Sequence, residues 1–488
     1  MLTYDVVLRG GRVIDPESGL DAVRDVAIAG DRVAAVGTGL PPGRQEADVD
    51  GQVVTAGFVD LHSHAHDLGS ARLQVAGGVT TALELEAGAT PVAGAYAAAA
   101  AAGRPLNYGF AASWALARMN VLAGVSVGGS VESLFANLAD PRWQRAATPA
   151  EIGRVLRILE SDVADGALGI GLLLGYAPGT TPEEYVAVAA LASAGGAATF
   201  THARDLVEFT PGGPVDGAEE IVRTAGETGA RMHYCHVNST TVRHADRVLG
   251  LVERAQRAGA QVSTEAYPYG AGMTGIGAAF LAPDRLAARG LTPASIIYAP
   301  TGEEVSTAAR LSELRAADPG GLAIIRQLDD DDPADQAVLL RYLTFPGSVI
   351  ASDAMPLTWI GAVPEPATWP LPPAAFTHPR TAGTYARSIR TLSRGGGMPL
   401  PEILAKCSLH PAMLLQDRVP AMRRKGRVSA GSDADIVVFD PEHITDQATY
   451  SASTRPSSGI RHVLVNGTFV VRDGRLDTDT RPGRPIRA

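Results

Sequence analysis

Short apolar segments that each end in a polar residue recur through the middle of the chain, and helix-like stretches rich in Ala and Leu separate them. Five segments, each written with the polar residue that follows or closes it, are 57–61 and His62, 197–201 and His202, 231–235 and His236, 261–266 and Tyr267, and 348–352 and Asp353. The helical stretches between them include residues 182–194, 217–228 and 241–257. Repeated strand–helix units of this length imply a parallel sheet with right-handed crossovers. So many units in succession favour a closed (β/α)8 TIM-like barrel.

Both ends of the chain differ from this middle part. Val- and Ile-rich segments bounded by Gly or Asp, which are typical of small antiparallel sheets, occupy residues 4–37 and 434–472. We therefore expect residues 1–55 and 421–488 to form one small β-sandwich domain, and residues 56–420 to form the barrel. Residues 283–345 interrupt the alternation with two helix-like pieces, and we expect an inserted segment near the barrel mouth there.

The composition of the 488-residue chain excludes several classes of protein. Hydrophobic residues make up 45% and charged residues 19%, as in a globular protein with a large core. A net charge of −10 without a basic cluster argues against nucleic acid or an anionic membrane as a partner. The first residues do not have the pattern of a secretory signal, and two cysteines do not make a disulfide framework. We expect a cytoplasmic protein that acts on a small molecule, with a homo-oligomer left open.

The strongest local signal is a pair of histidines two residues apart, His62 and His64. Residues two apart in a strand project to the same side, and barrel enzymes place their chemistry at the carboxyl ends of the strands. His202 and His236 end two other predicted strands, and Asp353 ends a third. Imidazole and carboxylate groups are ligands of divalent metals, and a carboxylate beside a metal-bound water can also accept its proton. These five residues predict a metal centre.

The order of these ligands across the barrel resembles the amidohydrolase superfamily, and within it the N-acyl-D-amino-acid deacylase branch (D-aminoacylase and D-glutamate deacylase). The resemblance covers nearly the whole chain. Its motifs are Ala56-Gly57-Phe58-Val59-Asp60-Leu61-His62-Ser63-His64, Gly78-Val79-Thr80-Thr81, Gly166-Ala167-Leu168-Gly169, Thr201-His202-Ala203-Arg204-Asp205, Tyr267-Pro268-Tyr269, Ser352-Asp353, His378-Pro379-Arg380 and Ala434-Asp435-Ile436-Val437-Val438-Phe439-Asp440.

This resemblance implies a role for each matching residue. His62, His64 and Asp353 would bind a more exposed metal, and His202 and His236 a more buried one. Asp353 would also be the general base that transfers a proton to the leaving nitrogen. Three further residues would lie near the substrate, polarising its carbonyl or holding a carboxylate: Tyr176, Tyr267 and Arg380. The implied cofactor is zinc, as one or two divalent ions.

The chain departs from the branch at two positions. A metal-binding cysteine of the branch falls on Ala87 here, and the neighbouring Glu86 is the best candidate for a carboxylate that bridges two metals. The alternative is that Glu86 pairs with an arginine. Where the branch has a lysine that grips the substrate carboxylate, this chain has Asn238. Arg204 or Arg380 could replace that lysine, since a guanidinium binds a carboxylate through two hydrogen bonds, although Arg204 could equally form a salt bridge with Asp205 or a nearby loop.

The sequence is compatible with three candidate functions. The first is hydrolysis of the amide bond of an N-acyl amino acid, in this branch an N-acyl-D-amino acid, by a metal-activated water. The second is hydrolysis of a cyclic amide or imide, as in hydantoinases and dihydroorotases, or deamination. The third is a barrel that has lost its metals and acts as an assembly protein, against which the intact set of ligands argues.

Overall fold

The computed structural model describes residues 4–126, 128, 131–360, 368–395 and 397–488. Eight parallel strands form a barrel in the order β17-β12-β11-β10-β9-β8-β7-β6. Their bounds are β6 Phe58–Asp60, β7 Val79–Ala89, β8 Asn107–Ser113, β9 Gly169–Leu173, β10 Ala198–His202, β11 Arg231–Tyr234, β12 Val262–Ala266 and β17 Ser348–Ile350. The predicted (β/α)8 barrel is therefore confirmed.

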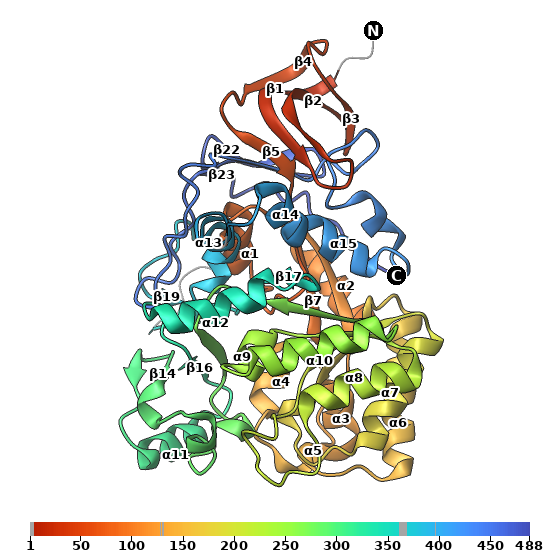
Figure 1. Cartoon of the computed structure of the whole chain (residues 1–488), viewed down its shortest axis with the longest axis vertical. Helices are drawn as coiled ribbons and strands as arrows, with labels where there is room; N and C mark the ends of the chain where they lie inside the picture. The colour runs from red at the N-terminus through yellow and green to blue at the C-terminus, as the bar shows by residue number, and fades with distance from the viewer. Residues whose placement is uncertain (1–3, 127, 129–130, 361–367, 396) are drawn as a thin grey trace.

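Helices surround this barrel, with α7, α8 and α10 along one side (Figure 1). The principal ones are α1 Leu68–Ala76, α2 Val92–Ala102, α3 Trp114–Ala123, α6 Pro149–Ala164, α7 Pro182–Ala194, α8 Gly217–Thr228, α10 Ala245–Arg257, α12 Pro333–Thr344 and α13 Arg380–Arg394. Their starts follow from capping residues: Thr148 and Glu151 form a capping box at α6, and Asp216 accepts hydrogen bonds from two backbone N–H groups at α8. In the described part of the chain, no helix has both the length and the apolar character required to cross a membrane.

The barrel closes where its first and last strands meet, just above the strand ends. Ser63 and Ala354 form a parallel bridge, and the backbone N–H of His64 donates to Ala354 O at 2.8 Å. Below this bridge, Asp60 accepts hydrogen bonds from the backbone N–H of Ser352, at 3.0 Å, and from its hydroxyl. These bonds hold the segment of His62 and His64 against the segment of Asp353, so closure of the barrel also brings predicted ligands together.

The segment between β12 and β17 forms a small structure of its own beside the barrel. Strands β13 Ala271–Gly275, β14 Ile296–Tyr298, β15 Glu303–Glu304 and β16 Leu322–Arg326 make a four-stranded sheet, joined by α11 Ala308–Ala317. Figure 1 shows β14, β16 and α11 together at the end of the molecule away from β1–β4. The pattern of residues 283–345 predicted the two helices α11 and α12, whereas the short strands between them were not predicted. The boundaries of the insertion remain a prediction.

The two ends of the chain build one sheet. Strands β1 Tyr4–Asp15, β2 Leu20–Ala29, β3 Arg32–Gly37, β4 Gly43–Asp48 and β5 Val53–Ala56 come from the start, and β20 Ile436–Phe439, β21 Ile460–Val465, β22 Thr468–Arg472 and β23 Arg475–Leu476 from the end. The halves join where β5 pairs antiparallel with β20. This sheet has a separate apolar core that includes Leu8, Val54 and Ile436. A small β domain made from both termini is thus confirmed, while its boundaries at residues 55 and 421 stay predictions.

Candidate metal centre and active site

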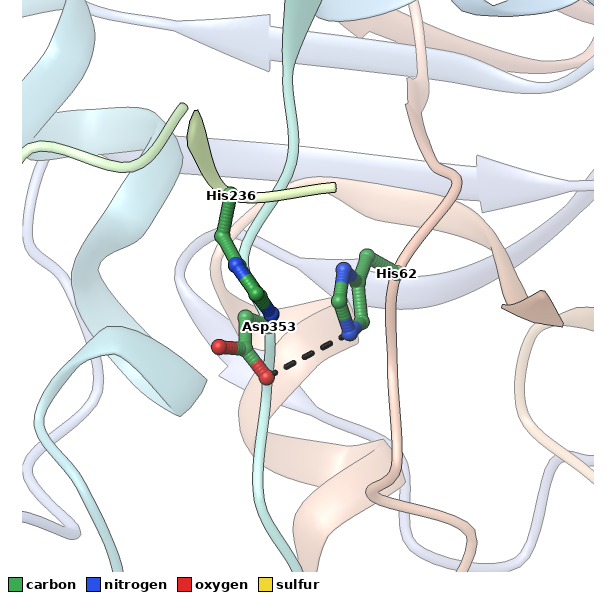
Figure 2. Close-up of side chains that lie close together, drawn as sticks. All are labelled: His62, His236 and Asp353. Atoms are coloured by element: carbon green, nitrogen blue, oxygen red, sulfur yellow. Dashed lines mark ion pairs between the residues drawn. The ribbon is translucent and has the colours of Figure 1, made fainter. Parts of the chain in front are cut away.

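The six side chains predicted as metal ligands lie together at the carboxyl-terminal end of the barrel. His62 and His64 follow β6, Glu86 lies in β7, His202 ends β10, His236 follows β11, and Asp353 follows β17. These six supply three groups of three residues whose ligand atoms all lie within 4.8 Å of one another. Figure 2 shows His62, His236 and Asp353 pointing toward one another from three separate segments of the chain. All six side chains are buried.

Glu86 lies between two pairs of histidines. Its Oε2 is 3.3 Å from His62 Nε2 and 3.5 Å from His64 Nε2. Its Oε1 is 2.7 Å from His236 Nε2 and 3.2 Å from His202 Nδ1. Burial opposes ionisation of this carboxyl group, yet the charges of His236 and His62 hold the pKa of Glu86 well below its usual value. Glu86 is therefore an anion that faces four predicted ligands, which come from the ends of three strands, β6, β10 and β11.

Asp353 completes the first pair of histidines and also contacts an arginine. Its Oδ1 lies 3.5 Å from Nε2 of both His62 and His64, and its Oδ2 forms an ion pair with Arg380 Nη2 at 2.8 Å. The backbone of Asp353 has a φ of 50°, and that of His236 has a φ of 29°. Positive φ is uncommon for residues other than glycine, and such strain concentrates at functional sites. The fold thus holds the backbones of Asp353 and His236 in conformations that residues other than glycine rarely adopt.

A second layer of carboxylates holds the HxH pair from behind. Glu84 Oε2 lies 2.8 Å from His64 Nδ1, and a Glu265 oxygen contacts His62 Nδ1 closely. A carboxylate opposite Nδ1 keeps the proton on that nitrogen and leaves Nε2 free to bind a metal. Burial lowers the pKa of His64, but Glu84 more than offsets this and raises it to about 9. Burial raises the pKa of Glu84, but the neighbouring His64 more than offsets this and lowers it to about 2.

This set of donors fits a divalent metal of the zinc type. His62 Nε2 and His64 Nε2 are only 3.1 Å apart, and two bare imidazole nitrogens at that distance repel unless a proton or a cation lies between them. Imidazole nitrogens together with carboxylate oxygens are ordinary zinc ligands. The four histidines fall into two pairs on either side of Glu86, so the geometry has room for one ion or for two.

All of the predicted ligands except His62 line a cavity with about 720 Å³ of empty space, part of which is open solvent. Its wall contains both polar and apolar residues, and it combines residues of the barrel with residues of the segment between β12 and β17. Six of these apolar residues are Leu134, Phe135, Phe280, Leu281, Leu291 and Ile325. An apolar cleft with a few polar groups at one end is the usual form of a site for a small molecule.

Three of the residues predicted near the substrate lie beside this centre. The Tyr176 hydroxyl pairs with Thr274 Oγ1 at 2.7 Å, and burial, reinforced by Glu86, raises the pKa of Tyr176. Burial likewise raises the pKa of Tyr267 to about 12. Its buried hydroxyl has no hydrogen-bond partner among the described residues. The Arg380 guanidinium stacks 4.7 Å over the Tyr267 ring while it binds Asp353. Both tyrosines are therefore neutral hydrogen-bond donors.

Arg204, the fourth residue predicted near the substrate, is directed elsewhere. Its Nε donates to Glu220 Oε2 at 2.7 Å, and it is not among the described residues that line the cavity. This partner in α8 is neither Asp205 nor a residue of a nearby loop, the two alternatives named for Arg204, and the ion pair directs Arg204 away from the cavity. Instead, Arg289 is the one arginine or lysine among the described residues of the cavity wall. It forms an ion pair with Asp205 and lies over the Phe280 ring, 4.8 Å from its centre.

Sequence reasoning missed Arg289 and Glu265. Nothing in the Ala-Ala-Arg-Gly context of Arg289 distinguishes it from an ordinary surface arginine. Glu265 did carry a signal, because strand alternation places it on the same side of β12 as Tyr267, two residues later.

Asn238 lies in α9 (Val237–Thr241), and its amide group bridges the backbone N and O of Tyr267 at 3.4 Å each. It therefore supports Tyr267 rather than facing the cavity wall.

A (β/α) barrel with histidines and carboxylates gathered at the strand ends, facing a cavity of this kind, has the form of a metal-dependent hydrolase. Residues 45–471 match the model of the Amidohydrolase family, and the chain belongs to that family, in its D-aminoacylase branch. It is thus a hydrolase of C–N bonds other than peptide bonds.

Relatives of known activity align over nearly the whole chain. The D-aminoacylase of Alcaligenes xylosoxydans xylosoxydans is 30% identical over 96% of this chain and 94% of its own length. The N-acyl-D-glutamate deacylase of the same organism is 29% identical over 99% of this chain and 96% of its own length. Among solved structures, the N-acyl-D-glutamate deacylase of Bordetella bronchiseptica, complexed with zinc and a phosphonate inhibitor, has the same fold. Its TM-score is 0.77 with 23% identity, covering 100% of both chains.

Proposed function

We propose that the chain is a zinc-dependent deacylase that hydrolyses the amide bond of N-acyl-D-amino acids. The observation that carries the proposal is the convergence of four histidines and Asp353 around Glu86 at one end of a cavity lined by both polar and apolar residues. The D configuration and the N-acyl group of the proposed substrate are taken from two relatives, an N-acyl-D-glutamate deacylase and a D-aminoacylase. A cytoplasmic location is part of the proposal and rests on the sequence.

The proposal assigns the ligands as two sets joined by one carboxylate. His62, His64 and Asp353 would hold one ion, His202 and His236 the other, and Glu86 would bridge them. A divalent cation in this position supplies a Lewis acid that lowers the pKa of water toward neutrality. Zinc is the metal of the related deacylase from Bordetella bronchiseptica, and the donor set suits it.

The chain's own residues provide the proton transfers and the hydrogen bonds. Asp353 faces the histidines through Oδ1, where it can accept a proton from the attacking water and deliver it to the departing nitrogen. Arg380 holds Oδ2 and so fixes the orientation of this carboxylate. Tyr176 and Tyr267 are neutral phenols at the cavity, where they can donate a hydrogen bond to charge that develops on the carbonyl oxygen.

The carboxylate of the substrate requires a cation, and the family lysine is replaced by Asn238, whose amide is engaged with the Tyr267 backbone. Arg289 lines the cavity, and Arg380 has two buried N–H groups, Nε and Nη1, without a partner in the described part of the chain. A guanidinium binds a carboxylate through paired hydrogen bonds. We assign the recognition of the substrate carboxylate to these two arginines.

The test is steady-state hydrolysis by zinc-loaded protein of N-acetyl and N-formyl D- and L-amino acids, together with hydantoin and dihydroorotate rings. The expected result is turnover confined to N-acyl-D-amino acids, with the Asp353→Asn protein as the inactive control. Turnover of rings alone would overturn the proposal in favour of a cyclic amide hydrolase. Turnover of L substrates alone would overturn the assigned configuration.

A further inference from the structure

Glu265 is the one buried carboxylate of the described site that contacts ligands from both metal positions without being a ligand itself. It lies in β12, and 1% of its surface is exposed. Its Oε1 contacts His62 Nδ1 and accepts a hydrogen bond from the backbone N–H of His236 at 3.1 Å. Its Oε2 lies 3.0 Å from His233 Nε2, and His233 Nδ1 lies 2.8 Å from Ser263 Oγ. A continuous hydrogen-bonded chain thus runs from Ser263 through His233 and Glu265 to a metal ligand.

We propose that Glu265 is a positioning residue that organises one ligand of each proposed metal position, and that His233 holds Glu265 in place for this purpose. The inference rests on the metal binding of the proposed function and extends it to residues that no metal would touch. It distinguishes Glu265 from Glu84, which faces His64 and, at 3.5 Å, His66, and so supports only one ligand of the set.

The contact with His62 sets which nitrogen of that ring binds metal. Because the carboxylate accepts at Nδ1, the proton of the ring stays there, and Nε2 is left bare toward Glu86 and Asp353. A fixed ring also loses less side-chain entropy when the metal binds. Without Glu265 the His62 ring could turn over or take its proton on Nε2, and either change would remove a ligand.

The contact with His236 acts through the backbone. His236 has a φ of 29°, a strained conformation for a residue other than glycine, which persists only where its surroundings impose it. The hydrogen bond from its N–H to Glu265 Oε1 is one such restraint. This conformation turns the side chain so that Nε2 lies 2.7 Å from Glu86 Oε1. Glu265 Oε1 therefore fixes both the His62 ring and the His236 backbone, and these two residues contact different oxygens of Glu86.

His233 makes this arrangement specific. Its Nε2 contacts Glu265 Oε2, and its Nδ1 contacts Ser263 Oγ. Because the residue is only 2% exposed, its ring cannot turn without breaking both contacts. It lies opposite Ser263 in the register of β11 and β12, in the strand that His236 follows. His233 packs against the Phe200 ring, with 5.5 Å between the ring centroids, and its contact with Oε2 fixes the second oxygen of Glu265.

The experiment measures zinc affinity by competition with a chromophoric chelator for wild type, Glu265→Gln and Glu265→Ala. Gln keeps the shape and loses the charge, and we expect its zinc affinity to fall by about 10- to 100-fold. Ala should bind less zinc still, and His233→Gln should lie between wild type and Glu265→Gln. Glu220→Gln is the matched control, since Glu220 is also a buried carboxylate but pairs with Arg204 and belongs to none of the groups of described residues that could hold a metal.

The unfolding midpoints of the metal-free and zinc-loaded proteins separate positioning from a merely structural role. We expect Glu265→Gln to lower the midpoint of the zinc-loaded protein alone. The proposal is overturned if Glu265→Gln binds zinc as tightly as wild type, or if it lowers both midpoints equally. A wild-type protein that binds no zinc would overturn the proposed function as well, so the two failures are distinguishable.

Discussion

The ion pair between Asp353 and Arg380 should dominate the stability of the metal-free site. Arg380 is fully buried, and its Nη2 forms an ion pair with Asp353 Oδ2 at 2.8 Å while donating to Met273 O at 3.4 Å. Its Nε and Nη1 have no partner in the described ranges, so Asp353 is its main counter-charge. Asp353→Asn leaves this cation buried and unpaired, and removing one partner of a buried pair costs about 3–5 kcal/mol. The double variant with Arg380→Met removes both charges, and it should recover most of the loss.

Urea unfolding of chelator-treated protein, followed by far-UV circular dichroism, gives the four free energies of unfolding needed for a double-mutant cycle. We expect an interaction energy of about 2–3 kcal/mol, at the upper end of the range for residues in contact. Both variants that carry Asp353→Asn should be inactive, so stability and activity are separated. Equal unfolding free energies for Asp353→Asn and the double variant would refute the reasoning, because they would mean that Arg380 does not depend on Asp353 for its charge balance.

The remaining predictions concern single groups. Glu86→Gln should lower zinc affinity by more than about 100-fold, beyond the effect of groups that only touch ligands, as metal analysis by chelator competition will show. Tyr267→Phe should lower kcat by about 10- to 1000-fold, as the loss of an oxyanion donor does, yet leave the unfolding free energy unchanged because its hydroxyl has no partner in the described chain. Arg289→Met should raise KM for N-acetyl-D-amino acids more than for their amides, which lack the carboxylate. Burial lowers the pKa of Lys406 from 10.5 to about 8, and so the buried charge costs stability below pH 8. This cost is relieved as pH rises from 8 to 10.5, and urea unfolding should show wild type gaining up to about 3 kcal/mol over Lys406→Met in that window.

The fold could be predicted from the sequence because its signals are local and repeated. Several barrel strands are apolar runs that end in or precede a polar residue, as in β10 with His202 and β12 before Tyr267, and some of the following helices begin at a capping residue such as Thr181. The pairing of β5 with β20 joins segments almost 400 residues apart. Similar composition at the two ends predicted that they share one domain, but not which strands pair. The strands β14–β16 escaped prediction because each has five residues or fewer and too few alternations to show a period.

The candidate site could be predicted where a side chain ends a strand, and not where it arrives from elsewhere. Barrel geometry alone places His62, His202 and His236 at one end, so strand position is sufficient for them. Arg289 reaches the cavity from the segment between β12 and β17, and only tertiary packing determines that. The same holds for Arg204, whose neighbour Glu220 lies in α8 and draws it away from the cavity.

The balance of charge in the buried site explains why these residues occur together. Glu84, Glu86 and Glu265 are buried within the described site, and the neighbouring histidines lower the pKa of each of them despite burial, so all three are anions at neutral pH. In the described part of the chain, the ion pair of Arg380 is with Asp353 and not with these three glutamates. The excess negative charge must be met by protons on the histidines, which is why the pKa of His64 is raised, or by a divalent cation. Glu86 places an anion among the four histidines, so the buried charge of this site favours either protons on these rings or a bound divalent cation.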